Sequence, residues 1–294
     1  MLRNLLLAVI LIILVLVLMT YLKTNLLYQP HPTTADKYNR FIAKLQLLAE
    51  TKEHLTNVLV TTQDNHRLDT VFVRNPDSPR LIIFFHGNAG NITMRFDMLK
   101  FLYNYASVLV FDYRTFGLST GSPSGLSGLK LQVDADAIWN YAVHHLGFTP
   151  DSITLFGESL GCAVAVQLAH RLHQQSIPVH PRALVLNSPF SSLRSMIVRT
   201  FDRINIKPIG QLVASIYGRE YDTSTYIRSL HPSTEILIAH SPRDEIVPYR
   251  EGYALYSIAV TAHANTKFVP ISGTHNNLRL TDTYIYALAD LHAD

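Results

Sequence analysis

Short apolar runs, separated by turns and amphipathic stretches, make up most of the chain after residue 80. Most of these runs are continuous rather than alternating, which is typical of strands covered on both faces. Strands that alternate with helices predict a parallel sheet with helices on either side, and such sheets bind ligands beyond the carboxyl ends of their strands. The runs expected to form the sheet are residues 81–85, 108–111, 153–156, 183–186, 236–239 and 267–269.

Two further elements precede these runs. Residues 33–50 carry apolar side chains at helical spacing, which predicts a helix with one buried stripe. Residues 58–62 and 68–73 predict a hairpin of half-buried strands joined by a polar turn. The prolines of residues 28–32 end any helix that comes before them. We therefore expect residues 31–294 to form one α/β domain, because no repeat or low-complexity linker divides them.

The N-terminal segment differs sharply from the rest of the chain. Residues 5–19 contain no polar side chain, and the stretch extended to residue 22 would span about 27 Å as a helix. This length predicts a single-pass membrane anchor within residues 1–30. A cleaved signal peptide is the alternative, but residues 19–25 offer no small-x-small cleavage site. Arg3 and Lys23 give a weak charge bias that places the body of the protein outside the cytoplasm.

Residues 191–234 are longer than a simple crossover helix requires and are rich in apolar side chains. Two interpretations stay open for this region. It could form ordinary helices packed on the sheet, or it could form a lid that walls an apolar pocket.

Composition excludes several classes of function. The formal net charge is +3, but Lys and Arg are scattered, so nothing favours nucleic-acid binding. The single cysteine, Cys162, excludes an intramolecular disulfide, and no Cys/His pattern typical of structural zinc is present. His170 and His173 could share a helix face, which is more typical of a polar surface than of a metal site. No phosphate-binding glycine loop occurs either, so we expect neither metal nor cofactor.

A serine stands at a strand-to-helix junction in residues 157–161, which read Gly-Glu-Ser-Leu-Gly. This sequence after a strand and before a helix is typical of a nucleophile elbow, so Ser159 is the predicted nucleophile. The amide of Leu160 would then lie at a helix N-terminus and could receive developing negative charge. Residues 117–121 repeat the Gly-x-Ser-x-Gly spacing, but turn residues follow them, so we place Ser119 in a loop.

A serine nucleophile needs a base and a group that orients the base. Asp244 follows the run 236–239 and His275 follows the run 267–269, so both lie on loops expected at the same sheet edge as Ser159. We predict that His275 is the base and Asp244 the orienting acid. Glu245 is the alternative acid and His240 the alternative base.

The turn after the run 81–85 reads His-Gly-Asn-Ala-Gly-Asn over residues 86–91. A glycine-containing turn of this kind can aim backbone N–H groups at the space above the sheet. The Asn88 amide is the predicted second donor of an oxyanion hole, with the Ala89 amide as its competitor. His86 is interpreted as structural.

Six motifs together resemble the α/β-hydrolase superfamily: residues 86–91, 112–119, 157–161, 187–190, 244–248 and 273–277. They are most similar to its membrane-anchored branch, which includes depalmitoylating thioesterases and lysophospholipase-like enzymes. The resemblance covers residues 28–290 and implies the α/β-hydrolase fold. Where that branch would have glycine, this chain has Thr115 and Cys162. Neither difference removes a catalytic group, and Cys162 is interpreted as a buried apolar residue in a helix.

These features predict a membrane-anchored serine hydrolase that cleaves an ester or thioester through an acyl-enzyme. The membrane anchor and the apolar region 191–234 favour a substrate with an acyl chain, either a lipid or a lipidated protein. A peptidase that uses the same triad is one alternative, and a non-catalytic anchored binding protein is another. The sequence carries no signal for the oligomeric state.

Overall fold

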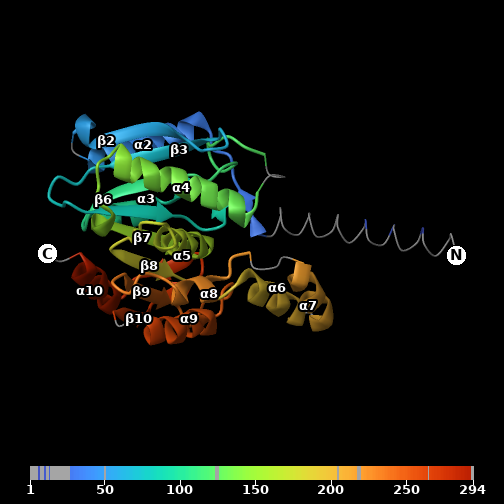
Figure 1. Ribbon diagram of the computed structural model, residues 1–294. Coiled ribbons are helices and arrows are strands. Elements are labelled where there is room, and N and C mark those ends of the chain that lie inside the picture. The colour runs from blue at the N-terminus through green and yellow to red at the C-terminus, as the bar shows by residue number, and fades with distance from the viewer. Residues whose placement is uncertain are drawn as a thin grey trace.

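An eight-stranded sheet forms the centre of the protein, as shown by a computed structural model (Figure 1). The structure describes residues 6, 10, 13, 27–49, 51–122, 126–203, 205–216, 220–263 and 265–292. The strand order is β10-β9-β8-β7-β4-β6-β3-β2. The strands are β2 (Leu55–Thr61), β3 (Arg67–Val73), β4 (Leu81–Phe85), β6 (Ser107–Phe111), β7 (Ile153–Glu158), β8 (Ala183–Asn187), β9 (Glu235–His240) and β10 (Thr266–Pro270).

Strand pairing confirms the mostly parallel sheet. All neighbouring pairs from β10 to β6 are parallel, whereas β3 is antiparallel to both β6 and β2. The hairpin expected from the sequence is therefore the β2–β3 edge of the sheet. Each of the six apolar runs forms one of the parallel strands.

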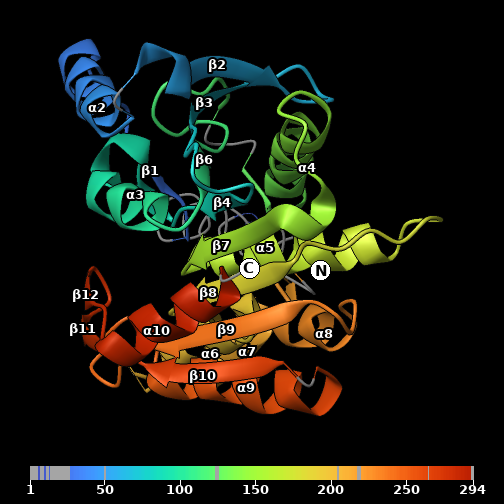
Figure 2. The same ribbon diagram turned by 90° about the vertical axis from the view of Figure 1, so that its left-hand side faces the viewer.

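Continuous apolar strands form here because helices cover both faces. In β4, Leu81, Ile83 and Phe85 face one core, and Ile82 and Phe84 face the other; all five are fully buried. The first core is covered by α4 (Gly128–His144), α5 (Leu160–His173), α8 (Thr223–Arg228) and α9 (Tyr249–Ala262). The second is covered by α2 (Ala35–Leu48), α3 (Phe96–Tyr103) and α10 (Asp282–Leu291), which lie on the opposite side of the sheet in Figure 2.

Local signals explain several helix boundaries. The Thr34 side chain caps α2 by accepting a hydrogen bond from the Lys37 amide, and Tyr38, Phe41 and Leu45 form the buried stripe. The turn 86–91 does not lead directly into an α-helix. A 3-10 turn, η3 (Ile92–Met94), comes first, and α3 starts at Phe96. Two other 3-10 turns are η2 (Lys52–His54) and η5 (Pro150–Ser152).

Region 191–234 contains two kinds of helix. The helices α6 (Leu193–Asp202) and α7 (Lys207–Ile216) pack on each other and extend beyond the sheet at the right of Figure 1. In contrast, α8 packs on α5 and α9 beside the sheet. The helix α8 therefore packs as the first interpretation describes, and the lid interpretation stays a prediction for α6 and α7.

Short strands complete the description. The strand β1 (Gln29–Pro30) pairs in parallel with β5 (Ala89–Gly90), and β11 (Ser272–Thr274) pairs with β12 (Asn277–Arg279). None of the described helices is both long enough and apolar enough to cross a membrane. The span predicted over residues 5–22 lies outside the described residues, apart from residues 6, 10 and 13.

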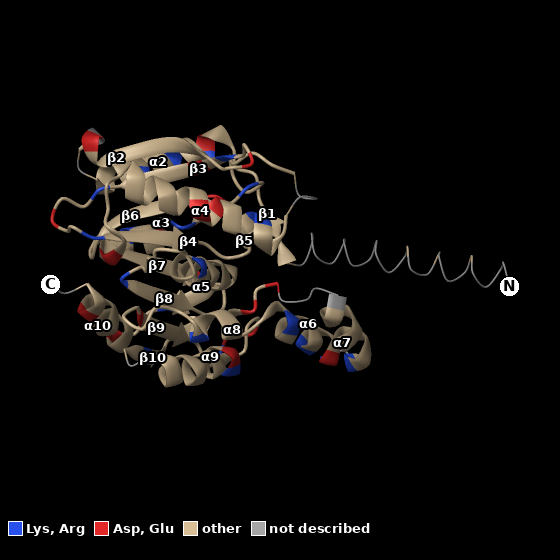
Figure 3. Ribbon diagram, in the orientation of Figure 1, with Lys and Arg blue, Asp and Glu red and all other residues tan. Residues whose placement is uncertain are grey.

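Charged residues are dispersed over the fold. Figure 3 shows Lys and Arg distributed among Asp and Glu on many elements, without a continuous basic face in that view. This distribution agrees with the scattering of positive charge along the sequence.

Candidate active site

Ser159 lies at the sharp turn between β7 and α5. Its φ of 51° and ψ of −112° are strained for a residue with a side chain. Glycines on either side make the turn possible. A Cβ on Gly157 would lie 2.6 Å from the backbone of Cys162, and a Cβ on Gly161 would lie 2.0 Å from the carbonyl oxygen of Phe85. The Gly-x-Ser-x-Gly spacing is therefore required by backbone contacts on both sides of the serine.

The structure brings Ser159, His275 and Asp244 together. His275 Nε2 lies 3.1 Å from Ser159 Oγ, and His275 Nδ1 lies 2.7 Å from Asp244 Oδ2. Asp244 follows β9, and His275 lies in the turn between β11 and β12, a small hairpin where the sequence predicted a loop. An imidazole held between a hydroxyl and a carboxylate can accept the hydroxyl proton while its other nitrogen donates to the carboxylate.

The Asp244 carboxylate is fully buried and well bonded. Its Oδ1 accepts hydrogen bonds from the amides of Ile246 and Val247, at 3.0 and 2.8 Å. Burial alone would raise the pKa of Asp244, but the neighbouring His240 and His275 outweigh it and hold the pKa below its usual range. The carboxylate is therefore ionised wherever the protein is folded near neutral pH.

The alternative acid and base occupy supporting positions. Glu245 is exposed, and its Oε2 accepts from the backbone amide of His275 at 3.1 Å rather than from the imidazole. His240 is fully buried behind the carboxylate, with Nε2 2.9 Å from the Val247 carbonyl oxygen and 3.4 Å from Asp244 Oδ2. Among these side chains, only His275 contacts the Ser159 hydroxyl.

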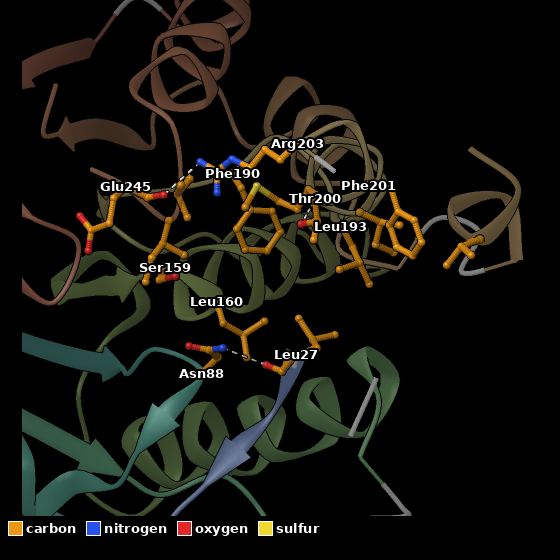
Figure 4. Close-up of a pocket in the computed structure, with 15 residues that line it drawn as sticks. Leu27, Asn88, Ser159, Leu160, Phe190, Leu193, Thr200, Phe201, Arg203 and Glu245 are labelled. Carbon is orange, nitrogen blue, oxygen red and sulfur yellow. Dashed lines mark hydrogen bonds between the residues drawn. The ribbon is translucent and has the colours of Figure 1, made fainter. Parts of the chain in front are cut away.

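Asn88 and Leu160 lie beside Ser159 on one cavity. Leu160 is the first residue of α5, so its amide has no carbonyl one turn earlier in the helix to bond. Asn88 follows β4, and Figure 4 shows it across from Leu160 and Ser159. The competitor, Ala89, belongs to β5 and is not among the residues that line the cavity. Of the two residues, Asn88 lines the cavity, and its role as an oxyanion donor stays a prediction.

The cavity itself is about 310 Å³ and mostly apolar. It extends from Ser159 along α6 and α7, so the part of region 191–234 that leaves the sheet forms one of its walls. Arg203 contributes a cation, whose Nη2 donates to the Glu245 carbonyl oxygen at 3.1 Å. The lining residues are Leu27, Asn88, Ser159, Leu160, Phe190, Leu193, Met196, Ile197, Thr200, Phe201, Arg203, Val213, Glu245, Ile246 and Val247 (Figure 4).

Residues that the sequence did not predict to be catalytic have structural explanations. Ser119 lies in a loop, where its hydroxyl donates to the Asp112 carbonyl oxygen at 2.7 Å. Cys162 is fully buried, and its thiol donates to the Gly157 carbonyl oxygen at 3.1 Å. Burial raises the pKa of this thiol well above its usual range. Thr115 has a φ of 71°, which explains why glycine would suit its position.

No group of His, Cys, Asp and Glu side chains in the described part of the chain is arranged to hold a metal ion. His170 bonds Ser229 Oγ through Nδ1, at 2.9 Å. His173 stacks edge-on against the ring of His231. Both histidines therefore contact neighbouring side chains.

Sequence reasoning interpreted His86 as structural, but it missed two other polar residues near the turn 86–91, Arg95 and Glu158. His86 is fully buried, with Nδ1 2.7 Å from the Gly87 carbonyl oxygen. Arg95 donates from Nη2 to the Ala89 carbonyl oxygen at 2.8 Å and lies 3.8 Å from Glu158. Burial raises the pKa of Glu158, and Arg95 partly offsets this rise. The signal for His86 was its fully apolar strand context, which predicts a buried ring that needs a partner.

Comparisons with known proteins agree with this fold. A family model described as the alpha/beta hydrolase fold matches residues 80–208. Protein R595 of Acanthamoeba polyphaga mimivirus, which is uncharacterised, is 46% identical over 275 residues, covering 93% of this chain and 93% of the relative. Protein bem46 of Schizosaccharomyces pombe is 30% identical over 239 residues, covering 79% of this chain and 75% of the relative.

A lipase and a solved esterase are also similar. Lysophosphatidylserine lipase ABHD12 of Macaca fascicularis is 31% identical over 229 residues, 73% of this chain. The match spans 54% of that lipase, about half of its length. The structure of a Pyrococcus furiosus esterase superposes with a TM-score of 0.64 at 20% identity, covering 85% of this chain and 90% of the esterase. At that identity the likeness concerns the fold alone.

Proposed function

Because the chain belongs to the alpha/beta hydrolase family, we propose that it is a serine hydrolase that cleaves carboxylic esters or thioesters. One observation carries this proposal. The hydroxyl of Ser159, the imidazole of His275 and the carboxylate of Asp244 form a continuous hydrogen-bonded series beside an apolar cavity.

The geometry supports acyl transfer to water in two steps. His275 Nε2 takes the Ser159 proton as Oγ attacks the acyl carbon, and the Leu160 and Asn88 amides hold the resulting oxyanion. The carbonyl re-forms, the bond to the leaving oxygen or sulfur breaks, and His275 returns its proton to the leaving group. Water then attacks the acyl-enzyme by the same route and releases the carboxylic acid. Asp244 keeps the imidazole oriented and stabilises its protonated form.

The cavity favours a substrate with an acyl chain. Its apolar wall from α6 and α7 starts at the nucleophile, so a chain bound there would place its carbonyl carbon at Ser159. Two functions suit this shape: hydrolysis of a lysophospholipid, as the name of ABHD12 states for that lipase, and hydrolysis of a thioester on a lipidated protein. The Arg203 guanidinium offers further donors to a phosphate or carboxylate at the cavity wall.

Attachment to a membrane would bring such a substrate to the site. The apolar residues 5–22 support a single-pass anchor, with the catalytic domain outside the cytoplasm. The α6–α7 pair would then act as a lid over the acyl-binding cavity. The anchor is proposed from the sequence pattern, and the lid is proposed from the cavity wall that α6 and α7 form. Together they describe a membrane-anchored esterase that acts on lipids.

A panel of substrates tests this function. The full-length protein in detergent is assayed on acyl esters and thioesters of increasing chain length, on lysophosphatidylserine and monoacylglycerol with one matched chain, and on aminoacyl nitroanilides. We expect turnover of esters or thioesters that increases with chain length. Turnover confined to the nitroanilides would indicate a peptidase, and no turnover in the whole panel would indicate a binding protein; either result contradicts the proposal.

A further inference from the structure

A short segment near the N-terminus is bonded directly to the turn that carries Asn88. We call this segment, residues 27–32, the strap. Its strand β1 pairs in parallel with β5, so that Gln29 lies opposite Ala89 and Pro30 opposite Gly90. The two partners are about sixty residues apart in sequence, and the pairing lies at the edge of the cavity that contains Ser159. The strap is thus a part of the active-site wall.

Four consecutive carbonyl groups of the turn each have a donor. The Gly87 oxygen lies 2.7 Å from His86 Nδ1, and the Ala89 oxygen accepts from Arg95 at 2.8 Å. The strap supplies the other two donors. The Gln29 amide donates to the Asn88 oxygen at 2.8 Å, and the His31 amide donates to the Gly90 oxygen at 3.3 Å.

These bonds determine where the Asn88 amide points. A trans peptide is planar, so the Asn88 N–H points opposite to the Gly87 carbonyl that His86 holds. The Gln29 amide fixes the following peptide plane, and the two planes together set both backbone dihedral angles of Asn88. The Asn88 side chain adds a third restraint, because its Nδ2 donates to the Leu27 carbonyl oxygen at 3.1 Å (Figure 4).

The strap is itself anchored to the rest of the fold. Tyr28 is fully buried in the first core, and its hydroxyl lies 2.7 Å from the hydroxyl of Tyr221, just before α8. The His31 carbonyl oxygen accepts from the Asn91 side chain at 2.9 Å and from the Gly117 amide at 3.2 Å. A segment anchored in the core and bonded at both of its ends can transmit its position to the turn.

We propose that the strap is a positioning element for the oxyanion hole: the Gln29 amide and the Leu27 carbonyl hold Asn88 so that its own amide faces the substrate's carbonyl oxygen when Ser159 attacks the carbonyl carbon. The inference rests on the ester hydrolysis proposed above. It makes the segment that leaves the predicted membrane anchor a determinant of turnover, although the strap supplies no group to the reaction itself. We expect loss of the strap's hydrogen bonds to lower kcat rather than to raise KM, because the oxyanion forms only after the substrate is bound.

Gln29→Pro tests the inference, with Gln29→Ala as the matched control. The Gln29 side chain is exposed, so alanine removes it and keeps the amide, whereas proline removes the amide that bonds Asn88. Loss of a whole oxyanion donor typically lowers kcat by about 10²- to 10³-fold. For a donor that is present but misoriented, we expect about a tenfold fall in kcat with KM unchanged. Gln29→Ala should behave as the wild type.

Turnover is measured on a soluble butanoyl ester with the full-length protein, and kcat is expressed per site labelled to completion by a fluorophosphonate. A purely structural role would lower the number of labelled sites and leave kcat per site unchanged. Asn88→Ala, which deletes the bond to Leu27 but keeps the backbone amide, is the second variant and should lose kcat in the same way. If Gln29→Pro does not fold, Asn88→Ala still tests the inference.

Three results would overturn the inference: unchanged kcat per site in the variants that fold, equal losses in Gln29→Pro and Gln29→Ala, or a loss confined to KM. Wild-type turnover separates this test from the test of the proposed function. If the wild type hydrolyses no ester, the function fails; if it hydrolyses the ester and the variants match it, only the role of the strap fails.

Discussion

Gly161 lies so close to the end of β4 that a Cβ on it would stand 2.0 Å from the carbonyl oxygen of Phe85. This contact joins the start of α5, just after Ser159, to the strand that leads into the turn 86–91. The two parts of the predicted oxyanion hole are therefore set at a fixed separation by backbone contact. A side chain at residue 161 would force them apart.

Gly161→Ala is expected to destabilise the protein by about 3 kcal/mol and to abolish ester turnover, because backbone at β4 cannot move as a flexible side chain could. Gly87→Ala is the control near the same site. A Cβ there would meet its nearest neighbour at 3.6 Å, an ordinary contact. Thermal unfolding in detergent measures both variants. Equal stability of Gly161→Ala and wild type would show that the close approach does not exist in solution.

Asp244→Asn should lower kcat by about 10⁴-fold with little change in stability, because an amide can donate to His275 Nδ1 and so favour the wrong tautomer. Glu245→Gln keeps an acceptor for the His275 amide and should stay within about threefold of the wild type. Steady-state kinetics of both variants on one soluble ester shows whether Asp244 or Glu245 is the orienting acid. If Glu245→Gln caused the larger loss, the orienting acid would be Glu245.

Met196→Trp should shorten the acyl chain that the protein accepts. Met196 lies on α6 in the cavity wall, so a larger side chain would fill space that a long chain needs. We expect kcat/KM to fall about tenfold for a dodecanoyl ester and to stay unchanged for an acetyl ester, which is within the range of about 1–3 kcal/mol typical of apolar pocket contacts. Arg194→Trp, on an exposed part of the same helix, is the control. Equal losses on both esters would place the acyl chain elsewhere.

The sequence was sufficient for the sheet and for the polar residues at its edge. Each continuous apolar run became a strand because helices cover both faces, and loops after parallel strands meet at one edge regardless of their separation along the chain. This is why Asp244 and His275 could be placed near Ser159 from their positions alone.

Contacts between short irregular segments could not be predicted in this way. Residues 28–32 indicated only the end of a helix, because two prolines and a histidine have no periodicity that reveals a partner strand. The pairing of Gln29 with Ala89 depends on backbone groups, which every residue carries. The path of α6 and α7 away from the sheet could not be predicted from the sequence either. An apolar helix face indicates that the face is buried, but not which element covers it.

Asp69 gives a prediction about pH. Its carboxylate is buried and accepts from the Tyr38 hydroxyl at 2.5 Å, and burial raises its pKa to about 6. In the unfolded chain the pKa would be about 3.9, so between these values the folded state keeps a proton that the unfolded state has lost. Stability therefore falls as the pH rises from about 4 to about 6, by roughly 3 kcal/mol.

Asp69→Asn removes this titration while keeping an oxygen for Tyr38. We expect the variant to be more stable than the wild type at about pH 7.5, with the difference much reduced at about pH 4. Thermal unfolding at the two pH values measures it. A difference of the same size at both would mean that the Asp69 carboxyl does not titrate with a raised pKa.

The central claim is that Ser159 is a nucleophile activated by His275 and Asp244, and a fluorophosphonate adduct located by mass spectrometry tests it most directly. The account predicts one adduct, on the peptide that carries Ser159, with full labelling retained in Ser119→Ala and lost in Ser159→Ala. An adduct on any other residue, or equal labelling of Ser159→Ala and the wild type, would contradict it.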